Sequence, residues 1–137
     1  MKVELNRLND AVHFEASGSS SVKVHIDGSE AIGGQGLGVR PMELVLMALG
    51  SCSSLDLISI LKKQRQDFTD LSVSVEGERR EASPPVFTKI HMIFKITGNV
   101  DVSKAEKAAE LAVKKYCSVH DMLVAGGVEV TYSIHVA

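Results

Sequence analysis

The sequence contains only two cysteines, Cys52 and Cys117, about 65 positions apart. Neither belongs to a Cys-x-x-Cys pair, and none of the five histidines has metal-ligand spacing. The sequence therefore predicts no metal, no cofactor and no secreted disulfide scaffold. In a reducing compartment, two such thiols are either space-filling core residues or a redox pair.

Strong net charge and long uncharged runs are also missing. The formal net charge is −2, with Lys and Arg scattered, which gives no reason to expect a nucleic-acid partner. The uncharged run at 44–55 is shorter than the roughly 20 residues that cross a bilayer, and no signal-type apolar region follows Met1. We expect a cytoplasmic chain with no membrane partner.

A single long helix from Arg40 to Arg65 is the main element that the sequence does contain. Pro41 suits the first helical position, and Lys62 and Lys63 suit the last turn. Apolar residues from 44 to 49 surround the helix, so it must be buried on every side. The apolar run is interrupted at 50–54 by small residues, and Cys52 is one of them.

The other elements follow from alternation and capping signals. Strands are predicted as a meander over residues 3–27, a hairpin of 71–76 with 86–96, and a last strand over 128–136. Val86, Thr88 and Ile90 are expected on one face with Met92, Phe94 and Ile96. The glycine-rich segment 27–39 lacks the spacing of a phosphate loop and is predicted to be flexible.

Two further helices precede the last strand. Ser103 is the expected cap of the first, with Tyr116 on its apolar face, and Ser118 with Asp121 has capping-box spacing for the second, which reaches Val124. The order β-β-β-α-β-β-α-α-β predicts an α+β fold in one domain, residues 1–137. Because so few strands cannot bury the long helix alone, a homodimer is expected.

The two thiols differ in their predicted surroundings. Cys52 lies in the middle of the long helix, where a cysteine often only fills space. Cys117 comes just before a helix N-terminus, where amide dipoles lower a thiol pKa, and His120 could add to this or lie on the surface. The other histidines are expected at the surface, because all fall on the polar phase of strands: His13, His25, His91 and His135.

Charged groups near Cys52 are few. Glu43 lies nine positions earlier, about 13.5 Å along a straight helix and on its opposite side. A cation that activates the Cys52 thiol must therefore come from elsewhere. Sequence spacing does not indicate which arginine supplies it; apart from Arg65 at the end of the helix, the candidates are Arg7, Arg40, Arg79 and Arg80.

Four segments together resemble the OsmC/Ohr family, that is, osmotically inducible protein C and the organic hydroperoxide resistance protein. They are Gly33-Gly34, then RPMEL at 40–44 with ALGSCS at 48–53, then PVFTKIH at 85–91, and KYCSV at 115–119. The resemblance covers nearly the whole chain in the right order, with both cysteines in place.

The resemblance implies an intertwined homodimer in which two central helices lie between six-stranded sheets made from both chains. It also implies a thiol peroxidase that reduces organic hydroperoxides in oxidative-stress defence. Cys52 would attack the peroxide and become a sulfenic acid, Cys117 would condense with it to a disulfide, and an external dithiol would reduce that disulfide.

The chain departs from the peroxidase pattern at the start of the long helix. Peroxidase members carry Asn-Pro-Glu where this sequence has Arg40-Pro41-Met42, so Glu43 falls one position after the family's glutamate. Arg40, from a bent segment or a partner chain, is the substitute cation and Glu43 the substitute acid in the predicted site. Two other functions stay open: a dimer that binds a small apolar ligand, and a redox sensor without turnover.

Overall fold

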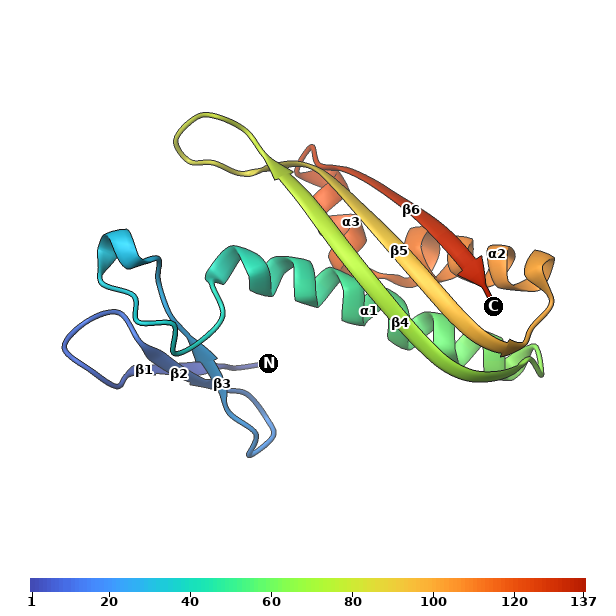
Figure 1. Ribbon diagram of the computed structural model, residues 1–137, viewed down its shortest axis with the longest axis horizontal. Helices are drawn as coiled ribbons and strands as arrows, with labels where there is room; N and C mark the ends of the chain where they lie inside the picture. The colour runs from blue at the N-terminus through green and yellow to red at the C-terminus, as the bar shows by residue number, and fades with distance from the viewer. The chain divides into compact units, whose positions relative to one another are not determined.

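The computed structural model describes all residues, 1–137, in two compact units, Met1–Val45 and Leu46–Ala137. Its strands and α-helices follow the predicted order, which confirms the α+β class (Figure 1). Two short segments were not predicted: a 3₁₀ helix, η1 (Glu30–Ile32), and a π-helical segment, η2 (Leu111–Tyr116).

The first unit contains the predicted three-stranded meander. Strands β1 (Glu4–Arg7), β2 (Phe14–Ser17) and β3 (Val24–Ile26) pair antiparallel in the order β1-β2-β3. Asn9 forms the first turn, because its side-chain oxygen accepts the backbone N–H groups of Ala11 and His13 at 3.0 and 3.2 Å.

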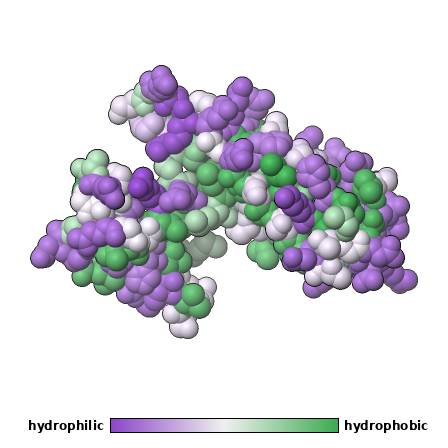
Figure 2. Space-filling view, in the orientation of Figure 1, coloured by the Kyte–Doolittle hydropathy of each residue, from purple (hydrophilic) through white to green (hydrophobic).

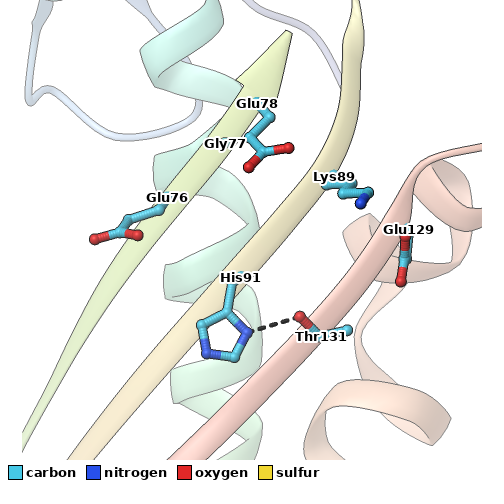
Figure 3. Close-up of a pocket in the computed structure, with 7 residues that line it drawn as sticks. All are labelled: Glu76, Gly77, Glu78, Lys89, His91, Glu129 and Thr131. Atoms are coloured by element: carbon cyan, nitrogen blue, oxygen red, sulfur yellow. Dashed lines mark hydrogen bonds between the residues drawn. The ribbon is translucent and has the colours of Figure 1, made fainter.

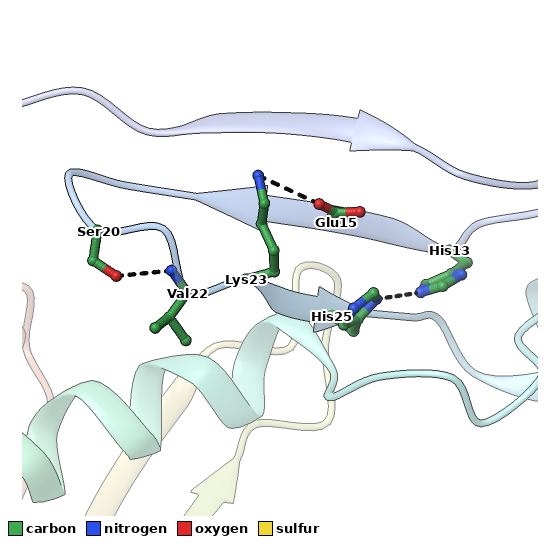
Figure 4. Close-up of polar contacts among 6 residues, drawn as sticks. All are labelled: His13, Glu15, Ser20, Val22, Lys23 and His25. Atoms are coloured by element: carbon green, nitrogen blue, oxygen red, sulfur yellow. Dashed lines mark hydrogen bonds and ion pairs between the residues drawn. The ribbon is translucent and has the colours of Figure 1, made fainter.

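Polar side chains cover one face of this small sheet (Figure 4). His13 Nε2 and His25 Nδ1 share a hydrogen bond of 2.9 Å, and Lys23 Nζ lies 3.4 Å from the Glu15 carboxylate. The prediction that His13 and His25 lie on the polar phase of their strands is confirmed.

The glycine-rich segment after β3, which was predicted to be a flexible loop, contains η1 and is organised around a buried carboxylate. Asp27 accepts backbone N–H groups from Gly28, Gln35 and Leu37 at 2.8 to 3.1 Å. A Cβ at Gly34 would lie 1.8 Å from the Gly28 carbonyl oxygen, which explains a glycine at that position.

The long helix is α1 (Pro41–Lys63), close to the predicted bounds. Pro41 is its first residue, and the Glu43 carboxylate accepts the Arg40 backbone N–H at 2.9 Å, as in a capping box. Its most apolar 18-residue window has a mean hydropathy of 2.0, so by length and composition alone α1 could cross a membrane, and 33% of that window is buried.

The second unit contains a sheet of three strands, β4 (Asp67–Arg79), β5 (Phe87–Asn99) and β6 (Glu129–Val136). Strand β5 pairs antiparallel with β4 and parallel with β6. Strand β4 is longer than predicted at both ends, because residues 67–70 and 77–79 also pair with β5. Near Arg79 the register shifts, so Phe87 is buried and Val86 is exposed, against the predicted alternation.

Helices α2 (Val102–Glu110) and α3 (Ser118–Ala125) pack near β6. Asp101, and not Ser103, caps α2, because its carboxylate accepts the Lys104 N–H at 2.9 Å. Tyr116 is half exposed, against its predicted place on the apolar face, since the π-helical turn of η2 changes the 3.6-residue period on which that prediction depended.

Helix α1 packs against β4 at a glycine. A Cβ at Gly50 would lie 2.8 Å from Val75 Cγ2, so only glycine permits this approach.

The buried core of this unit comes from α1, β5, α2 and η2: Leu49, Leu57, Leu61, Ile90, Met92, Phe94, Ile96, Ala105, Ala108, Ala109, Ala112 and Val113. In this single chain Met47 and Leu55 of α1 remain 48% and 70% exposed, and Figure 2 shows apolar residues at the surface among hydrophilic ones.

Replacing Asp27 by Asn should lower stability and remove part of its pH dependence. The N–H groups of Gln35 and Leu37 hold the pKa of Asp27 below its ordinary value of 3.8. This stabilisation is complete above that value and is lost as the pH falls through the lower folded pKa. Urea unfolding over a series of pH values measures it. Asp10→Asn, at an exposed position in the same unit, is the control, and equal pH dependence in both variants would contradict the expectation.

Candidate functional site

The structure brings Cys52 and Cys117 together from two separate elements. Cys52 lies in the middle of α1, and Cys117 is the residue that caps the N-terminus of α3. Both are free thiols, and Cys52 lies near enough to raise the pKa of the Cys117 thiol. Two thiols that the sequence separates by about 65 positions are therefore neighbours in the fold.

Cys117 itself, and not Ser118, is the N-cap of α3. Its Sγ accepts the backbone N–H of His120 at 3.3 Å, and its own backbone is extended, with φ −73° and ψ 107°. A thiol here takes the place of the hydroxyl or carboxylate oxygen that usually caps a helix. Ser118 is instead the first residue of α3.

Burial decides the acidity of Cys117. Burial raises its pKa, while hydrogen bonding from the Ser53 hydroxyl and the His120 N–H lowers it and the neighbouring Cys52 raises it further. The helix N-terminus acts in the predicted direction, but the net pKa lies above the ordinary value of 9.0, because the thiol is only 2% exposed. The prediction of a lowered pKa is wrong for this reason.

Ser53 is a part of the site that sequence reasoning missed. Its side chain is fully buried, and its hydroxyl forms no hydrogen bond of standard geometry. It nevertheless lies near enough to the Cys117 thiol to lower that thiol's pKa. The only feature of the sequence that pointed to Ser53 was its position in the run of small residues at 50–54.

The other predicted site residues, Arg40 and Glu43, form a pair of their own at the start of α1. The Glu43 carboxylate is engaged by the Arg40 backbone N–H. Both lie in the first unit, whereas the cysteines lie in the second. His120 is buried and not a surface residue, and its Nδ1 has no hydrogen-bond partner, with the Asp121 carboxylate at 3.7 Å.

A cavity of about 290 Å³ lies between α1 and η2. Its lining residues are Asp56, Ser59, Ile60, Lys63, Leu111 and Tyr116. Asp56 lies one helical turn after Cys52, and Tyr116 immediately precedes Cys117. Neither cysteine lines the cavity, but it lies beside both segments that carry the thiols, and its lining combines the apolar Ile60 and Leu111 with polar and charged side chains.

A second cavity, of about 280 Å³, lies on the sheet and involves neither cysteine (Figure 3). Three carboxylates, from Glu76, Glu78 and Glu129, line it together with Lys89 and His91. The His91 ring is held by Thr131 Oγ1 at 2.7 Å. No group of three or more His, Cys, Asp or Glu side chains in the chain is placed to hold a metal ion.

The two thiols should react with iodoacetamide at different rates. Cys52 is partly exposed, while Cys117 is buried with a raised pKa, so little of it is thiolate near neutral pH. We expect Cys117 in Cys52→Ser to alkylate at least about tenfold more slowly than Cys52 in Cys117→Ser, because burial both shields Cys117 from the reagent and keeps it protonated. Mass spectrometry measures both rates. Rates should become equal in urea, and equal rates in the folded variants would contradict the expectation.

Comparison with known proteins agrees with this architecture. The family described as OsmC-like protein matches residues 34–133. Protein YhfA of Escherichia coli K12 is 45% identical over 97 residues, which are 70% of this chain and 72% of YhfA. A hypothetical protein from Aquifex aeolicus VF5 has a crystal structure with a TM-score of 0.82 and 31% identity, covering 99% of this chain and 96% of that one.

A more distant structure shares the fold. The organic hydroperoxide resistance protein OhrB of Bacillus subtilis is 20% identical, with a TM-score of 0.65 over 97% of this chain and 96% of that chain.

Proposed function

Because the chain belongs to the OsmC-like protein family, we propose that it is a thiol peroxidase that reduces organic hydroperoxides, with Cys52 as the peroxidatic and Cys117 as the resolving cysteine. The observation that carries the proposal is the proximity of these two thiols, with Cys52 on α1 and Cys117 at the N-terminus of α3. Relatives named as organic hydroperoxide resistance proteins have the same fold.

The difference in exposure supports the two roles. Cys52 is partly exposed and can meet a peroxide, whereas Cys117 is buried beside it. The Cys52 thiolate attacks one peroxide oxygen, the O–O bond breaks, and an alcohol leaves after taking up a proton. Cys52 is then a sulfenic acid, which condenses with the Cys117 thiol to a disulfide and water. An external dithiol restores both thiols.

The cavity between α1 and η2 supports an organic peroxide in preference to hydrogen peroxide. Its volume is about 290 Å³, and Ile60, Leu111 and the Tyr116 ring can bury an apolar group. Arg40 remains the proposed cation and Glu43 the proposed acid, from the same chain or from a partner.

Stopped-flow mixing with cumene hydroperoxide tests the proposed activity. We expect Cys52 to react orders of magnitude faster than free cysteine, since an activated thiolate is the reacting species. Cys52→Ser should abolish the reaction, and Cys117→Ser should stop it at a sulfenic acid that dimedone labels. A wild-type rate equal to that of free cysteine, with no Cys52–Cys117 disulfide, would contradict the proposal and favour a ligand-binding protein. Oxidation without turnover by a dithiol would favour a redox sensor.

We also propose that the chain acts as a homodimer in which a second copy covers α1. Only 33% of the most apolar window of this helix is buried in the single chain, and Leu55 is 70% exposed at its centre. A soluble protein rarely leaves so apolar a helix open to water, and an identical copy is the partner that symmetry most often supplies.

Leu55→Lys should weaken the dimer, because it places a charge in the apolar contact. We expect at least a tenfold rise in the dimer dissociation constant, about 1.4 kcal/mol, measured by sedimentation equilibrium. Val102→Lys, at an exposed apolar position at the start of α2, is the control. An unchanged constant for Leu55→Lys, or a monomeric wild type, would contradict the proposal.

A further inference from the structure

The polar face of the β1-β2-β3 sheet brings together two histidines that lie twelve positions apart in the chain (Figure 4). His13 immediately precedes β2, and His25 is the central residue of β3. His13 Nε2 and His25 Nδ1 are 2.9 Å apart, and the ring centroids are 5.1 Å apart. Sequence spacing did not reveal this pair, because it depends on how β2 pairs with β3.

The surroundings of the two rings favour a cation. In the strand register Glu15 pairs with His25, and Asp27 comes next in the register, across from His13. Lys23, with its Nζ 3.4 Å from the Glu15 carboxylate, compensates one of these two negative charges. His13 is half-buried and His25 is exposed, so an ion in solution can reach the pair.

The spacing of the two ring nitrogens matches one kind of metal coordination. For metal–nitrogen bonds of about 2.0–2.1 Å, two ligands at right angles lie about 2.9 Å apart, and two ligands in a tetrahedral site lie about 3.3–3.4 Å apart. His13 Nε2 and His25 Nδ1, at 2.9 Å, have the right-angle spacing. This spacing is typical of tetragonal copper(II) and nickel(II), whereas zinc prefers the tetrahedral one.

We propose that His13 and His25 form a two-imidazole site for a tetragonal divalent ion, copper(II) or nickel(II). Water completes the coordination, because Lys23 holds Glu15 and three backbone N–H groups hold Asp27. The site therefore needs no group of three protein ligands, and the chain has none. Because the ligands come from two strands, a bound ion would join β2 to β3.

The ion takes the place of the hydrogen that the two rings share. Without an ion, one of the facing nitrogens donates this hydrogen to the other. With an ion, the neutral rings carry their hydrogens on His13 Nδ1 and His25 Nε2, and each ring turns about its Cβ–Cγ bond until its lone pair points at the metal. Protons compete for these lone pairs, so the affinity should fall as the pH drops through the range in which imidazoles take up protons.

Titration of the Cys52→Ser/Cys117→Ser chain with copper(II) tests the proposal, because without thiols copper is neither bound nor reduced by them. Electron paramagnetic resonance at one ion per chain should show coupling to two imidazole nitrogens. His13→Gln or His25→Gln should weaken binding at least about tenfold, since the remaining imidazole loses the second ligand held beside it. His135→Gln, which removes an exposed histidine of β6, is the control and should bind as the parent chain does.

Nickel(II) gives a second measurement that depends on the two strands. In the chain without cysteines it should raise the melting temperature, because it binds the folded pair and not the unfolded chain. The same rise is expected in His135→Gln and should be absent in His13→Gln. Far-ultraviolet circular dichroism before the addition of nickel shows whether each variant is folded.

Coupling to a single imidazole nitrogen in the chain without cysteines would overturn the proposal, and this measurement needs no histidine variant. An unchanged copper affinity in both His13→Gln and His25→Gln would overturn it as well. Neither result depends on the proposed peroxidase function, because the histidine pair lies in the first unit and the cysteines lie in the second.

Discussion

The close approach of α1 to β4 at Gly50 is the constraint on which the candidate site depends. A side chain at this position would collide with Val75, so glycine sets how deeply the helix packs against the strand. Ser53, one turn later, is buried as well. Cys52 lies beside these buried residues on the helix surface, between the exposed Ser51 and the buried Ser53, which explains why it is partly exposed.

The environment of Cys117 combines two opposing effects. Burial raises its pKa, and the donors at the start of α3 and on Ser53 lower it, with burial the larger of the two. Such a thiol stays protonated until an electrophilic sulfur is close, and is then stabilised as it gives up its proton. The arrangement suits a resolving cysteine better than a cysteine that must meet peroxide first, which is the division of roles that the family resemblance implies.

Local patterns predicted most of the helices and strands, but not which side chains cap them or make their longer-range contacts. Alternation and helical periodicity located the meander, α1, β5 and α2 because each signal lies within a few neighbouring residues. The cap of α2 was assigned to Ser103, but Asp101 reaches the Lys104 N–H. Tyr116 was placed on an apolar face, but η2 changes the period. Asp27 was missed, because its partners Gln35 and Leu37 lie eight and ten positions away.

The sequence by itself determined that the chain has one long apolar helix, that this helix carries a cysteine among small residues, and that a second cysteine comes just before a later helix. These conclusions depend on composition and spacing alone. Only the tertiary structure decided that the two thiols are neighbours, that Cys117 and not Ser118 caps α3, and that burial outweighs the helix N-terminus in setting the pKa of Cys117. The reason is physical: the residues that exclude water from Cys117 come from separate parts of the chain and surround the thiol only in the folded structure.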